Sequence, residues 1–403
     1  MSKLAIDGGT PVRTTPFPNW PVWGAEEEKL ILEVLHSGNW GGANKDKLAV
    51  LEQQFAHRHG ARHAINISNG TIAMTVALMA AGIEPGDEVI MPPYTFIATG
   101  TAALLAGAIP IFADVEEDTL LIDPHKVEER ITPRTKAIIA VHIAGAPANM
   151  TSLKAIADRH GLFLLEDAAQ AVGASWENHK VGTLGHAGTF SFQSSKNINS
   201  GEGGIILTDD DTLMETMWSI ANVGRVPGGA WYQHERIGWN FRMTEFQAAV
   251  ILGQMTRMDE QIRTRARNAA LLDKLISGLE QFQPFRNDER ITTHAYHIYM
   301  FKIRAELASP AMKEQVIRML HAEGIPVLPG YHSLNCNTAI IAETAKRTGK
   351  QSVYPCPVSE RISEAQVLWL GQAVLLGGEQ DIYDVADALR KVSARMNAYG
   401  LPD

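Results

Sequence analysis

The chain has 403 residues, which is long for one hydrophobic core and predicts a large domain with a smaller one beside it. Its 45% hydrophobic and 20% charged residues are typical of a globular protein. The net charge of -9, without any long run of lysine or arginine, argues against nucleic acid or an anionic membrane as a partner.

Membrane, secreted and zinc-binding classes are also disfavoured. No uninterrupted apolar run is long enough to cross a bilayer, and residues 1–9 lack the apolar stretch of a signal peptide. Cys336 and Cys356 are the only cysteines and have no motif spacing, so neither a disulfide framework nor a metal site is indicated. The sequence therefore predicts a cytoplasmic location.

The first half of the chain alternates between strand and helix signals. An irregular arm reaches to about residue 24, and helical spacing follows at 26–36 and 48–59. Strands are predicted at 63–67, 88–91, 109–115, 136–142 and 162–165, and helices at 71–81, 97–106 and 151–160. The strands are short and apolar on both faces, which predicts an α/β domain whose mostly parallel sheet carries helices on both faces.

The second half predicts a smaller C-terminal α+β domain. Helices are expected at 211–221, 244–279, 311–323, 364–375 and 380–396, and strands at 297–303 and 325–328. A helical stretch as long as 244–279 commonly bridges two domains. We therefore expect a large domain over residues 1–270, with the N-terminal arm, and a small domain over 271–403.

One lysine lies between two strand-like runs. Thr189–Gln193 leads into a polar turn with Lys196, the glycine-rich run 201–204 follows, and a second apolar run spans Ile205–Leu207. A lysine on a loop above buried strands loses hydration, which lowers its pKa and makes its amine a Schiff-base nucleophile. A lysine taken alone is far more often a solvated surface residue, so the rest of the chain has to decide.

Two further motifs follow predicted strands. Ser68-Asn69-Gly70-Thr71 lies between a strand and a helix, where the free N–H groups of a helix N-terminus bind phosphate; an ordinary helix cap is the alternative. Asp167, at the carboxyl end of a strand, could pair with a protonated ring nitrogen, and Gln170 could hydrogen-bond a ring substituent. Glu166 or Asp167 could instead cap a following helix.

Two segments add weaker signals. Pro92–Phe96 follows a strand and could stack an aromatic ring on a planar cofactor, although such a ring is more often part of a core. Gly238–Met243 precedes the long helix and could contact a phosphate or carboxylate, or simply lead into that helix. A phosphate cradle, an aromatic ring, an acid and a lysine at strand ends of one sheet are the parts that pyridoxal phosphate requires.

These motifs carry a resemblance to a known family. Ser68–Thr71, Pro92–Phe96, Glu166–Gln170, Phe190-Ser191-Phe192 with Lys196, and Gly238–Met243 stand as they do in the DegT/DnrJ/EryC1/StrS sugar aminotransferases. The chain resembles that family, of the fold-type I pyridoxal phosphate enzymes, over nearly its whole length.

The resemblance implies a role for each matching residue. Lys196 would form the Schiff base with pyridoxal 5'-phosphate and then move the proton, and Asp167 would keep the ring nitrogen protonated. Gln170 would contact the ring hydroxyl and Phe96 would stack on the ring. The implied phosphate ligands are Gly70, Thr71, Ser191 and, from the neighbouring subunit, Asn240. The resemblance thus implies a homodimer with shared active sites.

The presence of Lys196 favours transamination, because related dehydratases resemble this pattern with histidine in its place. An amino group would pass from glutamate or glutamine to a ketone. Phe-Ser-Phe-Gln-x-x-Lys resembles the branch that acts on keto-cyclitols or keto-sugars in aminocyclitol antibiotic biosynthesis. A 3-amino-5-hydroxybenzoate synthase, a nucleotide-linked keto-sugar aminotransferase and a non-catalytic regulator are the alternatives. The segment Gly330–Leu334 departs from the nucleotide-sugar pattern.

Overall fold

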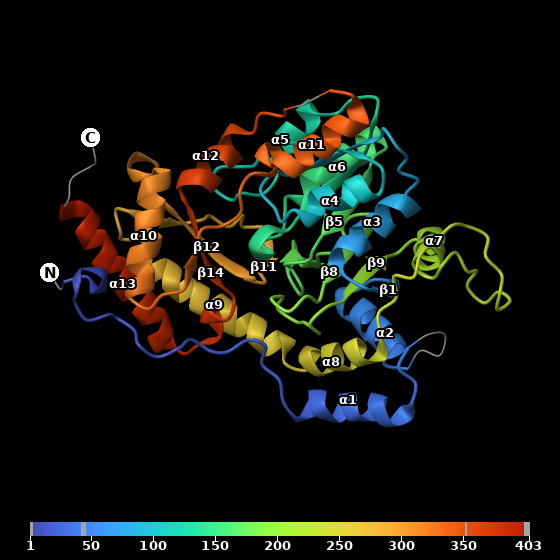
Figure 1. The fold of residues 1–403 in the computed structure, drawn as a ribbon, viewed down its shortest axis with the longest axis horizontal. Helices are drawn as coiled ribbons and strands as arrows, with labels where there is room; N and C mark the ends of the chain where they lie inside the picture. The colour runs from blue at the N-terminus through green and yellow to red at the C-terminus, as the bar shows by residue number, and fades with distance from the viewer. Residues whose placement is uncertain (1–2, 42–45, 351–352, 399–403) are drawn as a thin grey trace.

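A seven-stranded sheet forms the centre of the computed structural model, which describes residues 3–41, 46–350 and 353–398 (Figure 1). Its strand order is β1-β9-β8-β5-β4-β2-β3. The strands are β1 His63–Ile67, β2 Glu88–Met91, β3 Ile109–Phe112, β4 Thr135–Val141, β5 Phe163–Asp167, β8 Ala187–Ser191 and β9 Gly204–Thr208. β9 pairs antiparallel with β1 and β8, and the other pairs of this sheet run parallel. The predicted mostly parallel sheet is confirmed.

Both faces of this sheet are buried against helices. In β9, the side chains of Ile205 and Leu207 belong to one apolar cluster, and that of Ile206 belongs to another. Because successive side chains of a strand point to opposite faces, the two clusters lie on the two sides of the sheet. The helices of this part are α1 Ala25–Ser37, α2 Lys47–His59, α3 Gly70–Ala80, α4 Ala98–Leu105, α5 Pro124–Glu129, α6 Met150–His160, α7 Asp211–Ala221 and α8 Glu245–Met255.

A smaller antiparallel sheet, of order β10-β12-β14-β13, organises the C-terminal part. Its strands are β10 Phe282–Pro284, β12 Ile298–Ile303, β13 Val327–Leu328 and β14 Val367–Gly371. The helices nearby are α9 Met258–Ile276, α10 Pro310–Ala322, α12 Pro357–Ala365 and α13 Glu379–Ala398, whereas α11 Thr338–Thr348 packs against α4 and β3 of the large part (Figure 1). A third sheet joins β6 Ser175–Trp176, β7 His179–Lys180 and β11 Ile291–Thr293. The division at residue 270, which falls inside α9, stays a prediction.

The predicted helix 364–375 is wrong. The structure ends α12 at Ala365 and places the apolar run from Val367 to Gly371 in β14, between β12 and β13. A central strand is apolar on both faces, so periodicity alone does not distinguish it from a buried helix. The pairing with β12 and β13, which come from distant parts of the sequence, decides in favour of the strand.

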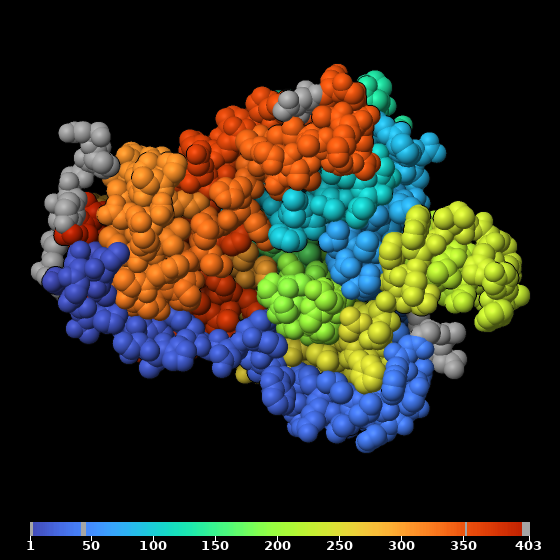
Figure 2. Space-filling view, in the orientation of Figure 1, coloured from blue at the N-terminus to red at the C-terminus, as the bar shows by residue number. Residues whose placement is uncertain are grey.

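The N-terminal arm runs along the C-terminal part before it reaches α1 (Figures 1 and 2). Leu4 belongs to the apolar cluster of the C-terminal sheet, and Arg13 pairs with Asp381 and Asp384 at 2.7 Å each. The indole N–H of Trp20 donates to the carbonyl of Ser194 at 3.0 Å. The arm therefore meets the loop between β8 and β9, which is the light-green segment near the centre of Figure 2.

Candidate active site

The loop that carries Lys196 joins the antiparallel strands β8 and β9 at one end of the large sheet. Its turn is closed by the N–H of Lys196, which donates to the carbonyl of Gln193 at 2.8 Å, and by the N–H of Ser194, which donates to Gly201 at 3.0 Å. The side-chain oxygen of Gln193 accepts from the N–H of Ser195 at 2.9 Å. The predicted lysine loop between two strands is confirmed.

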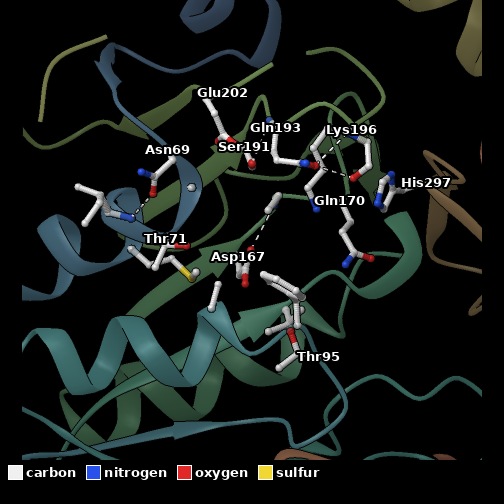
Figure 3. Close-up of a pocket in the computed structure, with 18 of the residues that line it drawn as sticks. Asn69, Thr71, Thr95, Asp167, Gln170, Ser191, Gln193, Lys196, Glu202 and His297 are labelled. Atoms are coloured by element: carbon white, nitrogen blue, oxygen red, sulfur yellow. Dashed lines mark hydrogen bonds between the residues drawn. The ribbon is translucent and has the colours of Figure 1, made fainter. Parts of the chain in front are cut away.

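Lys196 lines a cavity of about 620 Å³ that collects most of the predicted site residues (Figure 3). Those that line it are Gly70, Thr71, Phe96, Asp167, Gln170, Ser191 and Lys196. They come from the ends of β1, β2, β5 and β8 and from the lysine loop, as expected where parallel strands end at one edge. Asn240 does not line this cavity; it is exposed in the segment between α7 and α8.

Lys196 and Asp167, two ionisable residues of the cavity, have opposed pKa shifts. Loss of hydration lowers the pKa of Lys196 to about 8, while the nearby Asp167 carboxylate acts in the other direction. Burial raises the pKa of Asp167, and hydrogen bonds from Thr99 and Ala169 and the charge of Lys196 partly offset this rise. The lysine amine is therefore available as a nucleophile near neutral pH.

Glu166 and Asp167 are adjacent but have different surroundings. Glu166 accepts from the N–H groups of Gly182, Leu184 and Gly185, each at 2.7 Å, and from the ring of His142 at 3.0 Å. The Nδ1 atom of His142 accepts from the N–H of Ala148, so its Nε2 atom carries the proton that it donates to Glu166. Glu166 is thus fully engaged in holding the fold.

The carboxylate of Asp167 can still accept a hydrogen bond from a ligand. Its Oδ2 accepts from the hydroxyl of Thr99 at 2.9 Å, its Oδ1 accepts from the N–H of Ala169 at 3.2 Å, and no helix follows for it to cap. It is 6% exposed and is not within ion-pair distance of a cation in the described part of the chain. A protonated ring nitrogen would supply the positive partner that a buried carboxylate requires.

The N-terminus of α3 fits a phosphate. Asn69 caps the helix by accepting from the N–H of Ile72 at 2.9 Å, and within the described residues the N–H groups of Gly70 and Thr71 have no protein acceptor. A Cβ at Gly70 would lie 2.8 Å from the Cβ of Ser191, so glycine allows the helix start and β8 to meet. Free N–H groups and the hydroxyls of Thr71 and Ser191 are suitable donors for an anion.

Aromatic and amide side chains form the opposite wall. Phe96 is 50% exposed, and its ring centroid lies 6.0 Å from that of Tyr331. The amide of Gln170 donates to the Tyr331 hydroxyl at 3.1 Å and accepts from the N–H of Ala144 at 2.7 Å. The departure noted at Gly330–Leu334 thus places an aromatic residue, Tyr331, directly in the cavity wall.

Two contributors, Thr99 and His297, were not predicted from the sequence. Thr99 orients Asp167, and its hydroxyl is linked to that of Thr95 at 2.9 Å. His297 lines the cavity, and its Nδ1 lies 3.0 Å from the side-chain oxygen of Asn197. Its position directly before β12 is the one signal that the sequence offers. In the described residues no group of three or more His, Cys, Asp or Glu could hold a metal ion.

Comparison with known proteins identifies the fold and the family. The model of the DegT/DnrJ/EryC1/StrS aminotransferase family matches residues 21–390. The chain belongs to this family. It is therefore an aminotransferase that depends on pyridoxal phosphate, with the fold-type I architecture. No described helix of this aminotransferase is both long and apolar enough to cross a membrane.

Similar proteins include both curated sequences and solved structures. The L-glutamine:2-deoxy-scyllo-inosose aminotransferase of Streptomyces kanamyceticus is 39% identical over 97% of each chain. The crystal structure of 3-amino-5-hydroxybenzoic acid synthase has a TM-score of 0.88 at 33% identity and covers 95% of this chain and 100% of its own. The S. venezuelae DesV structure, in complex with a ketimine intermediate, has a TM-score of 0.82 at 31% identity. The match covers 94% of this chain and 99% of the DesV chain.

Proposed function

We propose that this aminotransferase moves the amino group of L-glutamine to the carbonyl of a keto-cyclitol. The supporting observation is the likeness, at 35–39% identity over nearly the full length, to proteins named for L-glutamine and scyllo-inosose ketones. Lys196 stands in its loop and lines the cavity, as a transaminase requires. The product class would be an aminocyclitol for antibiotic biosynthesis.

We propose the following roles for the residues of the cavity. Bound pyridoxal phosphate supplies an aldehyde that receives the amino group and a ring that accepts electron density from the donor carbon. Lys196 would hold the group through its amine at the aldehyde carbon, with water as the leaving group, and its free amine would move a proton from the donor carbon. Asp167 keeps the ring nitrogen protonated through its buried negative charge. Gln170 orients the ring hydroxyl, and Phe96 covers the ring face.

The phosphate is held by the α3 N-terminus with Thr71 and Ser191, and we propose that Asn240 reaches it from a second copy of the chain. The segment between α7 and α8 projects from the body of the molecule (Figure 1). It exposes Trp231, Ile237 and Trp239 at 82%, 82% and 42%. Exposed apolar side chains of this size indicate a surface that binds another protein. A homodimer would bury them and complete the site.

A substrate panel tests the proposed reaction. The enzyme is first converted to its amino form with L-glutamine and is then offered keto-cyclitols, free keto-sugars and nucleotide-linked keto-sugars. We expect kcat/KM for a keto-cyclitol to exceed that for a nucleotide-linked ketone by at least about 100-fold, since buried polar groups discriminate strongly between hydroxyl patterns. Release of water without consumption of glutamine would instead support the 3-amino-5-hydroxybenzoate synthase alternative.

Mixing two impaired variants tests the shared site. Lys196→Ala and Asn240→Ala are unfolded and refolded together, or exchanged as subunits, in equal amounts. If Asn240 serves the partner's cofactor, each hybrid dimer regains one intact site, and about a quarter of the wild-type sites reappear by random C2 pairing. If Asn240 serves its own chain, no intact site forms, and the mixture keeps only half the activity per chain of Asn240→Ala alone. Separate refolding of each variant is the control.

A further inference from the structure

A second cavity of about 290 Å³ adjoins the cavity of Lys196. The two cavities share Ser195, His297 and Tyr331, so a molecule that reacts at Lys196 can extend from the first cavity into the second. The other residues that line the second cavity come from the arm, from β12, β13 and β14, and from the turn after β14: Trp20, Ile298, Leu328, Trp369, Gly371, Gln372 and Ala373. No role proposed above uses this second cavity.

Most of the wall of the second cavity is apolar. The indole N–H of Trp20 donates to the carbonyl of Ser194, and the indole N–H of Trp369 donates to the hydroxyl of Tyr94, each at 3.0 Å. Because both N–H groups are occupied, the two indoles are fixed in position and offer a ligand only apolar ring surface. Leu328 is 51% exposed, so the cavity opens at the surface of the chain.

The residues shared by the two cavities are polar but uncharged. Nδ1 of His297 lies 3.0 Å from the side-chain oxygen of Asn197, to which it donates. Burial, together with nearby positive charges, lowers the pKa of His297 well below its usual value, so the ring is neutral. The hydroxyls of Ser195 and Tyr331 each make one hydrogen bond to a neighbouring glutamine, which leaves each able to form another. The passage between the cavities therefore suits an oxygen or a hydroxyl of a neutral molecule.

The lining disfavours a charged ligand group. None of the described residues that line the second cavity is lysine, arginine, aspartate or glutamate. Arg265 lies over the Trp20 ring at 5.6 Å, but it is 1% exposed and does not line the cavity, so it cannot contact a ligand there. A phosphate would lose water in this cavity without gaining the charged donors that normally bind it. In a nucleotide-linked sugar a diphosphate is joined directly to the reacting ring, so such a substrate does not suit this cavity, whereas an uncharged group does.

We infer that the second cavity binds a neutral sugar ring joined through an oxygen to the keto-cyclitol. This inference rests on the proposed function and extends its acceptors to glycosylated keto-cyclitols. A pyranose ring has a face of C–H groups that can stack on Trp20 or Trp369, while the hydroxyls at its edge stay in water or meet the polar residues of the passage. A volume of about 290 Å³ is at the lower end of the range for ligand pockets, about 300–1,000 Å³, and therefore suits one ring rather than a second whole substrate.

Filling the second cavity tests this inference. Leu328→Trp and Ala373→Leu add apolar volume to its wall, and neither residue lines the cavity of Lys196. The amino form of the enzyme is offered keto-cyclitols with and without a glucosyl group on one ring hydroxyl. We expect the wild type to prefer a glucosylated acceptor by about 10-fold in kcat/KM, and each variant to lose most of this preference while its kcat/KM for the bare keto-cyclitol changes less than about 3-fold.

A matched control adds the same volume elsewhere. Leu105 of α4 is 56% exposed, and Leu105→Trp should leave kcat/KM for both acceptors unchanged. Because Leu328 is also half exposed, Leu328→Trp should keep the fold, and it decides the test if Ala373→Leu does not fold.

The outcomes separate the inference from the proposed function. The half-reaction with L-glutamine, followed by the absorbance of the cofactor, should be the same in the wild type and in both filling variants. A loss in that half-reaction would assign the cavity to the donor side chain and overturn the inference, as would equal losses for bare and glucosylated acceptors. If the wild type uses bare keto-cyclitols but gains nothing from any glucosyl group, the inference is wrong and the proposed function stands. If it uses no keto-cyclitol of either kind, both are wrong.

Discussion

Lys196→Ala should lower turnover by about 10⁴-fold while the protein still binds pyridoxal phosphate without a covalent bond. The reason is that the amine is the proposed point of attachment and belongs to the one described lysine that lines the cavity. Turnover is measured by amino transfer from glutamine. Attachment is measured by borohydride reduction followed by peptide mass spectrometry, which should find the cofactor on Lys196 in the wild type and nowhere in the variant.

Lys180 offers a matched control for this substitution. Burial also lowers its pKa, and its amine donates to the carbonyl of Gly173 at 2.8 Å, but it does not line the cavity. Lys180→Ala should keep turnover within about 3-fold, because a lowered pKa alone does not make a lysine catalytic. Full turnover in Lys196→Ala, or cofactor found on another lysine of the wild type, would contradict the assignment of Lys196.

The sequence was sufficient for the parts of the site that follow strands. Gly70, Asp167 and Lys196 each stand next to a short apolar run, and parallel strands bring their carboxyl ends to one edge. The same rule accounts for the mostly parallel sheet. The sequence could not show which of Glu166 and Asp167 is free to bind a ligand. The three N–H donors that occupy Glu166 come from a turn almost twenty residues further on.

The rest of the site depends on contacts between distant segments. Gln170 contacts Ala144 and Tyr331, which come from two other segments of the chain, and no local pattern joins the three. The wrong helix at 364–375 has the same origin, since only pairing with β12 and β13 distinguishes β14 from a buried helix. For the site residues and for β14 alike, the contacts with distant segments, and not the residue types, determine the role.

Asp167→Asn should reduce kcat/KM by about 10²- to 10³-fold with little change in shape. The N–H of Ala169 would retain the remaining oxygen of the new side chain, so its amide nitrogen would replace Oδ2, next to Thr99. An amide carries no charge to stabilise a protonated ring nitrogen, and the ring would lose its proton at neutral pH. Turnover and the pH dependence of the cofactor absorbance measure the two effects.

Two neighbouring substitutions show whether the charge of Asp167 is responsible. Thr99→Val removes the 2.9 Å hydrogen bond to Asp167 and the one to Thr95 but leaves the charge of Asp167, so we expect a loss of about 10-fold or less. Glu166→Gln places an amide against N–H donors that the carboxylate now satisfies, and it should lower Tm while the folded enzyme keeps most of its turnover. Because Glu166 and Asp167 are adjacent and both buried, a loss of turnover confined to Asp167→Asn would follow from contact with the cofactor ring, not from burial of a negative charge. Equal losses of turnover in the two acid variants would refute this role for Asp167.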